Sequence, residues 1–127
     1  RLYAINVKSA LNSCRAALPH LAKPASIVNI GASAANRATA GMGAYAASKA
    51  GVHRLTEALA EELKDTGTRV NAVLPSIIDT PANRADMPDA DVSSWVTTTE
   101  LAQVIAFLLS PAASGITGAL LPVNGRV

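Results

Sequence analysis

The sequence has few aromatic residues, one cysteine and no long apolar run. Aromatic side chains make up 3% of the 127 residues, and the single cysteine, Cys14, cannot form an internal disulfide. Because free cysteines are usually buried, we expect Cys14 to pack in the interior. No apolar stretch approaches the ~20 residues of a membrane-spanning helix, and no signal peptide is evident. We therefore expect a cytoplasmic protein with no membrane partner.

Charged residues form no block of one sign. The chain has 11 Lys and Arg against nine Asp and Glu, a net charge of +2. It lacks the basic stripe of nucleic-acid-binding surfaces, so no nucleic acid partner is expected. His20 and His53 have no Cys, Asp or Glu at ligand spacing, so no metal site is expected either. Both histidines are predicted to be solvated or to lie at helix ends.

Helix-like and strand-like segments alternate along the chain. Apolar residues at helical spacing predict three helices, at residues 2–22, 44–65 and 99–109. Short apolar runs, rich in β-branched residues, predict three buried strands, at residues 26–30, 69–74 and 119–123. Two loops are predicted, at residues 31–43 and 75–98, the second because its prolines exclude a long helix. This alternation predicts an α/β fold, with parallel strands joined by crossover helices.

Three strands are too few for a complete doubly wound sheet. The first strand would leave one sheet edge open, and no G-x-G-x-x-G turn follows any strand. The chain also opens with Arg1 rather than Met, inside a helical pattern. We therefore expect residues 1–127 to be a single partial domain, the C-terminal half of a Rossmann-like sheet. The N-terminal dinucleotide-binding half is expected to be absent.

Tyr45 and Lys49 form the first candidate site. They lie four residues apart near the start of the predicted helix 44–65, so both side chains project from one face. An ammonium close to a phenol stabilises the phenolate, which makes a tyrosine usable as a general acid or base near neutral pH. The pair alone is a weak signal, since a tyrosine packed over a lysine stem has the same spacing. Its weight depends on the surrounding sequence.

Four segments, in order, resemble those of the short-chain dehydrogenase/reductase family. The central segment joins residues 27–33 (IVNIGAS) to residues 43–51 (GAYAASKAG), around Tyr45 and Lys49. The others are an opening helix that bears Asn6, a strand with its loop, and a closing segment: residues 6–9 (NVKS), 69–81 (RVNAVLPSIIDTP) and 116–125 (ITGALLPVNG). Together these segments cover nearly the whole chain.

The resemblance implies hydride transfer between the nicotinamide ring of NAD or NADP and a small-molecule substrate with a carbonyl or related acceptor. Tyr45 would give or take the proton. Lys49 would assist it and hydrogen-bond the nicotinamide ribose. Asn6 would hold a water of the proton relay through its helix backbone. Three residues would line the carboxamide end of the cofactor: Pro75, Ile78 and Thr80.

The chain departs from the family pattern at the serine that holds the substrate oxygen. That serine lies thirteen residues before the tyrosine, where this chain has Ala32. Ser33, one position later, either replaces it or is an ordinary loop hydroxyl. Ala32 and residues 79–95 resemble dihydropteridine reductase, whose quinonoid substrate needs the serine less. Trp95 is then a candidate to close over a flat substrate, or else a hydrophobic anchor of the loop.

Two other functions stay open. Residues 31–35 (GASAA) loosely match the G-x-S-x-G elbow of serine esterases, with Ser33 as the nucleophile, although that elbow needs a helix directly after the serine. The second is a non-catalytic role in assembly. In the family, the helices corresponding to 2–22 and 44–65 pack against their copies in a neighbouring subunit. Small residues such as Ala46 and Gly51 would permit this approach, so a homo-oligomer is expected.

Overall fold

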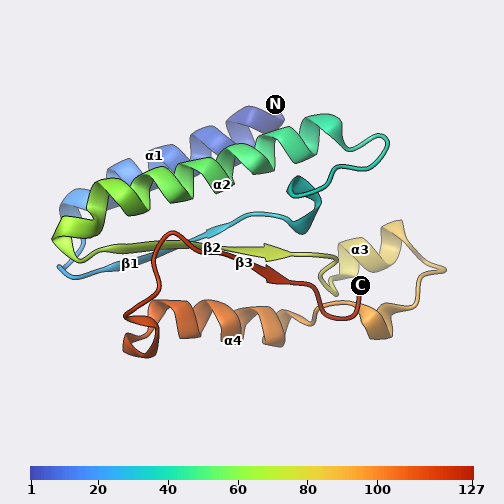
Figure 1. Ribbon diagram of the computed structural model, residues 1–127. Coiled ribbons are helices and arrows are strands. Elements are labelled where there is room, and N and C mark those ends of the chain that lie inside the picture. The colour runs from blue at the N-terminus through green and yellow to red at the C-terminus, as the bar shows by residue number, and fades with distance from the viewer.

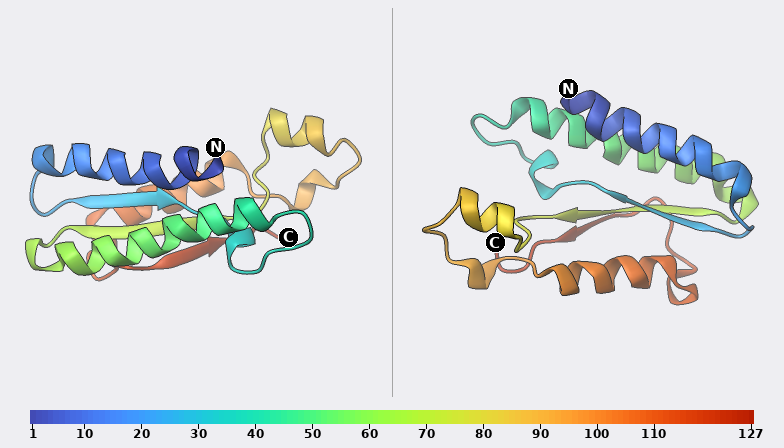
Figure 2. Two further views of the ribbon diagram at one scale, coloured as in Figure 1. Left: turned by 90° about the horizontal axis from the view of Figure 1, so that it is seen from above. Right: turned by 180° about the vertical axis from the view of Figure 1, so that it is seen from behind.

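The computed structural model describes residues 1–127 as a three-stranded parallel sheet with helices on both faces (Figure 1). The strands are β1 (Ser26–Ile30), β2 (Arg69–Pro75) and β3 (Leu120–Val123), in that spatial order. Helices α1 (Ser9–Ala17) and α2 (Gly43–Leu63) cover one face, and α4 (Thr98–Leu109) covers the other (Figure 2). The short α3 (Pro81–Asp86) lies beyond the carboxyl end of β2. The predicted α/β class and the three predicted strands are confirmed.

The central strand β2 forms the middle of the core. Val70, Val73 and Leu74 are fully buried, because helices cover both faces of the sheet and leave no side of this strand to water. The register pairs Val28 of β1 with Asn71 and pairs Ala72 with Leu120 of β3. The continuous apolar pattern of residues 69–74 therefore reflects burial on both faces.

Two apolar clusters lie on opposite faces of β2. Beneath α1 and α2, Val70 packs with Cys14, Leu59 and Ala60. Cys14 is 4% exposed, so its predicted packing role is confirmed, and burial raises the pKa of its thiol. Facing α4, the second cluster comprises Val73, Val96, Leu101 and Leu108. The sheet is thus held between two separate apolar layers.

The predicted helix 2–22 is helical but not uniform. It begins with a π-helical turn at Ala4–Lys8, continues as α1, and ends in a 3₁₀ turn at Leu18–His20. Pro19 lies in that last turn, where its ring and its missing N–H interrupt the α-helical hydrogen bonds. None of the helices combines the length and the apolar character needed to cross a bilayer.

The predicted loop 75–98 contains two short helical turns. It includes α3 and a 3₁₀ turn at Val92–Ser94, so the prediction of a plain loop is wrong at these places. Pro81 starts α3 instead of preventing it, because the N–H of the first residue of a helix makes no intrahelical hydrogen bond. The Thr80 hydroxyl caps the new helix by accepting from the Asn83 N–H at 3.2 Å.

Candidate active site

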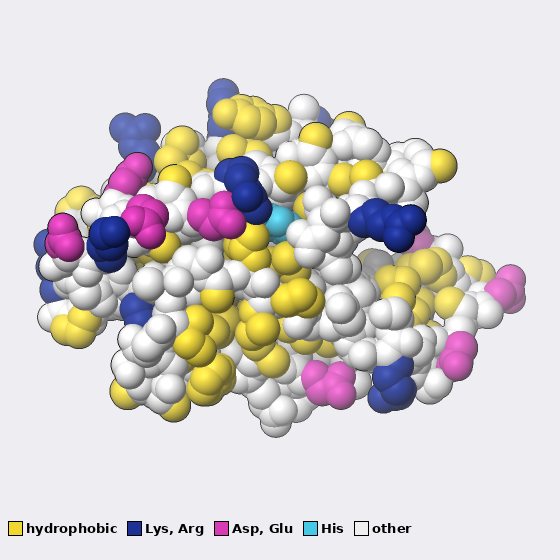
Figure 3. Space-filling view, in the orientation of Figure 1, with side chains coloured by type: hydrophobic (Ala, Val, Ile, Leu, Met, Phe, Trp, Pro, Cys, Tyr) yellow, Lys and Arg dark blue, Asp and Glu magenta, His cyan; other side chains and the backbone are white.

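A cleft opens at the carboxyl ends of β1 and β2. Parallel sheets bind ligands at this edge, where loops and helix starts leave the layer together. The cleft measures ≈ 720 Å³ and is lined by the end of β1 and its loop, the start of α2, the segment after β2, and α3. Figure 3 shows a hollow on this side of the molecule, beneath a basic side chain at its upper rim.

Tyr45 and Lys49 both line this cleft and are both half-buried. The helix geometry predicted from their spacing is therefore formed. Lys49 Nζ donates to the Ile30 carbonyl oxygen at 3.1 Å, which fixes the ammonium at the end of β1. Burial lowers the pKa of Lys49. Because an ammonium has three N–H donors, two are left for a ligand in the cleft.

The loop after β2 supplies part of the opposite wall. Pro75 and Ile78 line the cleft, as the sequence predicted, whereas Thr80 does not and serves as the cap of α3. Arg84 donates to both carboxylate oxygens of Asp79, at 2.6 and 2.9 Å. This two-point pairing holds the pKa of Asp79 below its ordinary value and ties α3 to the chain that leads into it.

Asn6 is not among the residues that line the cleft. It lies in the π-helical turn Ala4–Lys8, and its side-chain amide donates to Ser48 Oγ at 2.9 Å. Ser48 Oγ in turn donates to the Tyr45 carbonyl oxygen at 2.9 Å. Two hydrogen bonds thus connect Asn6 to the backbone of Tyr45. Isolated π-helical turns often occur at functional sites, and this turn packs against α2, the helix that carries Tyr45.

Ala32 and Ser33 both line the cleft, next to each other at the end of β1. Ser33 starts a 3₁₀ turn, Ser33–Ala35, and the next helix begins only at Gly43. A nucleophile elbow needs the helix to follow the serine at once, so the esterase geometry is not formed.

Comparison with known proteins agrees with this arrangement. The profile of a family described as Enoyl-(Acyl carrier protein) reductase matches residues 1–125. A short-chain type dehydrogenase/reductase from Mycobacterium ulcerans superposes with a TM-score of 0.90 at 29% identity, over 98% of this chain and 50% of that one. The chain belongs to the short-chain dehydrogenase/reductase family.

Relatives in this family carry several activities. The 3-oxoacyl-[acyl-carrier-protein] reductase FabG of Pseudomonas aeruginosa is 39% identical over 78% of this chain and 43% of its own. The 4-formylbenzenesulfonate dehydrogenase of Comamonas testosteroni is 35% identical over 98% of this chain and 56% of its own. A 3-ketoacyl-(acyl-carrier-protein) reductase from Brucella melitensis, solved with NADH, has a TM-score of 0.81 at 32% identity, over 95% and 54% of the two chains. The chain thus spans about half the length of these relatives.

A histidine of α2 contacts the wall of this short-chain dehydrogenase/reductase site, and its predicted position is wrong. His53, predicted to be solvated or at a helix end, is 2% exposed in the middle of α2. Its Nε2 accepts from the Ala32 N–H at 3.2 Å. Burial, with the cations Arg54 and Lys49, lowers the pKa of His53, against a smaller raising effect of Glu57. Its position four residues after Lys49, on the same helix face, is a sequence signal that could have identified it.

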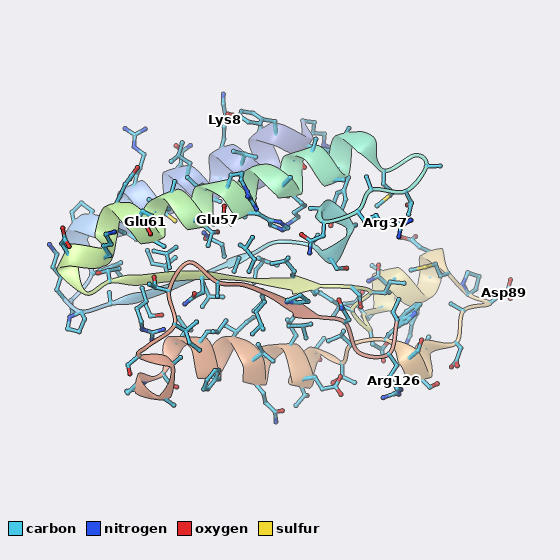
Figure 4. All side chains as sticks on the ribbon, in the orientation of Figure 1. Lys8, Arg37, Glu57, Glu61, Asp89 and Arg126 are labelled. Carbon is cyan, nitrogen blue, oxygen red and sulfur yellow. The ribbon has the colours of Figure 1, made fainter.

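Arg37 also lines the cleft of this family member and was not singled out from the sequence. Figure 4 shows it on the loop that joins the 3₁₀ turn Ser33–Ala35 to α2, on the side that faces α3. No acidic side chain lines the cleft together with Arg37 and Lys49. No spacing rule applies to a residue in such a loop, so only the fold brings this cation to the site.

Trp95 does not line the cleft. It is 5% exposed and lies beside Val96, the residue of the second apolar cluster that pairs with Ile78 in a parallel bridge. Gly125 approaches its backbone closely, with a φ of +61° and no room for a side chain against the Ser94 carbonyl oxygen. Of its two predicted roles, the structure favours the hydrophobic anchor over the lid above a flat substrate.

No group of three His, Cys, Asp or Glu side chains could hold a metal ion.

Proposed function

We propose that this chain forms the catalytic half of a nicotinamide-dependent oxidoreductase that reduces a carbonyl group or oxidises the corresponding alcohol. The observation that carries the proposal is the shared position of Tyr45 and Lys49. Both side chains leave one face of α2 and line the same cleft, at the sheet edge where ligands bind. Family membership and a relative solved with NADH support the choice of cofactor class.

The residues of the cleft fit the nicotinamide end of NAD or NADP. Pro75 and Ile78 give an apolar wall, and Lys49 keeps two N–H donors for a ribose hydroxyl. Thr80 was expected to contribute to this wall, but its hydroxyl caps α3. When bound, the reduced cofactor supplies the hydride, and the protein supplies orientation and a proton.

Tyr45 is the proton donor in this proposal. As hydride reaches the carbonyl carbon, the oxygen gains negative charge and takes the phenolic proton, which leaves an alcohol and a phenolate. The Lys49 ammonium stabilises that phenolate through its charge. Asn6, linked to the Tyr45 backbone through Ser48, would hold the water that returns a proton from solvent. Reversal of these steps oxidises an alcohol.

The pyrophosphate of the cofactor needs a second structural unit. No glycine-rich turn follows any strand of this chain, and such turns hold the pyrophosphate at a helix N-terminus. We propose that an N-terminal half, pairing with the open edge of β1, completes the sheet and this part of the site. The relatives, about twice as long as this chain, support that proposal.

Two acceptor classes are proposed for the substrate. A carbonyl compound is favoured, because the relatives are named as reductases and dehydrogenases of such compounds. In that case Ser33, which lines the cleft, would hold the carbonyl oxygen in place of the family serine. A quinonoid pteridine is the second class, since Ala32 occupies the serine position and such an acceptor needs that hydroxyl less.

Consumption of NADH and NADPH tests the proposal. The protein as encoded, with any in-frame upstream segment, is mixed with each cofactor and a series of aldehydes, ketones and quinonoid dihydropteridine. We expect acceptor-dependent loss of the reduced-nicotinamide absorbance, and weaker cofactor binding by fluorescence in Lys49→Met. Lys8→Met, on the outer face of the first helix, is the matched control. Absence of cofactor binding and turnover in the full-length protein would contradict the assignment.

We also propose that the protein assembles through residues 2–22 and 44–65. The exposed apolar side chains Leu2, Tyr3 and Ile5 at the start of this surface support it. The small residues expected to face a partner pack inside the chain instead, since Ala46 is buried and a side chain at Gly51 would meet Val7 at 2.8 Å. Light scattering that shows only monomer at micromolar concentration would contradict this part of the proposal.

A further inference from the structure

Two side chains of α2 hold neighbouring backbone groups at the end of β1. Lys49 donates to the Ile30 carbonyl oxygen at 3.1 Å, and His53 accepts from the Ala32 N–H at 3.2 Å. Residues 30–32 all line the cleft. The helix that carries Tyr45 therefore also fixes the cleft wall formed by residues 30–32, at one point on either side of Gly31.

The second of these bonds requires a neutral imidazole. Because the Ala32 N–H supplies the proton, His53 Nε2 must be unprotonated, which leaves the ring proton on Nδ1. An imidazolium carries a proton on both nitrogens, so two donors would face each other and the bond would be lost. The contact thus distinguishes between the two charge states of the ring.

Gly31 is shaped to accept this ring. A Cβ added at Gly31 would clash with His53 Nε2 and lie 2.6 Å from its Cδ2, with a Leu74 methyl 3.3 Å away. The imidazole therefore occupies the space that any side chain at position 31 would need. A larger residue there would push the ring out of reach of Ala32.

The surroundings of His53 favour its neutral form. The charged groups that shift the pKa of His53 are Arg54, Glu57 and Lys49, and all three belong to α2. Burial contributes most to the lowering of its pKa, followed by Arg54, with Glu57 opposing and Lys49 adding. At neutral pH the ring is therefore an acceptor, and acid turns it into a donor.

We propose that His53 is a positioning residue for the active site: its neutral ring holds Ala32 and so the cleft wall that receives the substrate, and protonation of the ring releases that wall. The effect on turnover rests on the function proposed above, whereas the hydrogen bond itself does not. The result is a cleft that loosens reversibly in acid while Tyr45 and Lys49 keep their places on α2.

Nuclear magnetic resonance of the unmodified chain tests the contact directly. We expect the Ala32 amide resonance to move with a midpoint equal to that of the His53 ring, and this midpoint to lie below the ordinary histidine value of 6.5. The Nε2 resonance should show an unprotonated nitrogen at neutral pH. An Ala32 amide that does not follow the titration of His53 would overturn the proposal.

Substitutions separate the acceptor from the bulk of the ring. His53→Gln keeps an acceptor near the Nε2 position without titrating, so it should retain most of the turnover and lose the acid sensitivity. His53→Leu keeps the volume without the acceptor and should lower turnover about 10–100-fold at every pH, as misplaced site residues do. His20→Gln, an exposed histidine on another helix, is the matched control and should keep the wild-type pH profile.

Gly31→Ala provides an independent steric test. The added methyl should displace the ring, so Ala32 should lose its pH-dependent shift although His53 is unchanged. The double variant Gly31→Ala with His53→Ala should recover the stability of the fold but not the pH-dependent shift of the Ala32 amide. If the Ala32 coupling is present and no cofactor is consumed, the proposed function fails and the positioning contact stands; if cofactor is consumed and His53→Leu is fully active, the positioning role fails alone.

Discussion

The two halves of α2 present one helix face to different surroundings. In the C-terminal half, Leu59 and Ala60 pack on β2 in the first apolar cluster. In the N-terminal half, Tyr45 and Lys49 face the cleft. His53 lies between them, buried like the first group and polar like the second.

One face of α2 thus packs on the sheet in its C-terminal half and lines the cleft in its N-terminal half. Positions 45, 49, 53, 56 and 60 follow one another at intervals of three or four, so they form a single stripe along the helix axis. Because an α-helix is stiff, fixing the apolar half on the sheet also sets the direction of the polar half. The cleft residues of α2 therefore need few contacts of their own.

The largest expected effect comes from removing the phenol of the polar half. Tyr45→Phe takes away the proposed proton donor and should lower kcat about 10²–10⁴-fold, in the range of general acid–base catalysis. The thermal midpoint should change little, since the side chain lies in an open cleft. Tyr3→Phe is the matched control, because Tyr3 is 59% exposed and outside the cleft. Turnover of Tyr45→Phe near the wild-type level would show that the N-terminal half of α2 does not supply the proton.

The apolar half is tested by Leu59→Ala. Leu59 is 8% exposed in the first cluster, and its truncation should lower the free energy of unfolding by about 2–5 kcal/mol, through lost burial and an unfilled cavity. Urea denaturation measures this change. Leu109→Ala, at an exposed position of α4, should cost less than about 0.5 kcal/mol. Equal losses for the two variants would contradict the division of α2.

A buried polar contact marks the boundary between the two halves. Thr56 Oγ1 accepts from Asn29 Nδ2 at 3.0 Å and donates to the Val52 carbonyl oxygen at 2.8 Å. Thr56→Val keeps the shape but leaves the Asn29 amide without this acceptor, so it should cost about 1–3 kcal/mol of stability. Thr99→Val on α4, where the threonine is exposed, is the control. A neutral Thr56→Val would show that the contact does not stabilise the fold.

The smallest effect is the pH dependence that His53 contributes to stability. Its pKa is lowered in the folded state, so the unfolded chain binds more protons between that value and the ordinary 6.5. Stability from this group is complete above pH 6.5 and is lost as the pH falls through this window, at no more than about 1.4 kcal/mol per pH unit. Urea midpoints at several pH values in wild type and His53→Gln measure the difference. A His53→Gln curve parallel to that of the wild type would contradict it.

Most of the fold could be predicted, because buried parallel strands and amphipathic helices leave strong patterns. The strand at residues 26–30 was placed at its observed limits, and the start of β2 at Arg69 was also correct. The short α3 could not be recognised, because the three prolines of residues 75–98 suggest a loop and the cap of α3 depends on how Thr80 turns. The subunit contact and the cofactor half stay predictions.

The sequence by itself determined the Tyr45–Lys49 pair and the α/β order, because both depend on spacing along one chain segment. Only the tertiary structure decided the surroundings of that pair: the hydrogen bond between the His53 imidazole and Ala32, the cation of Arg37 in the cleft, and the burial of Trp95 away from the cleft. These contacts join residues far apart in the sequence, and no local periodicity encodes which of them meet when the helices pack on the sheet.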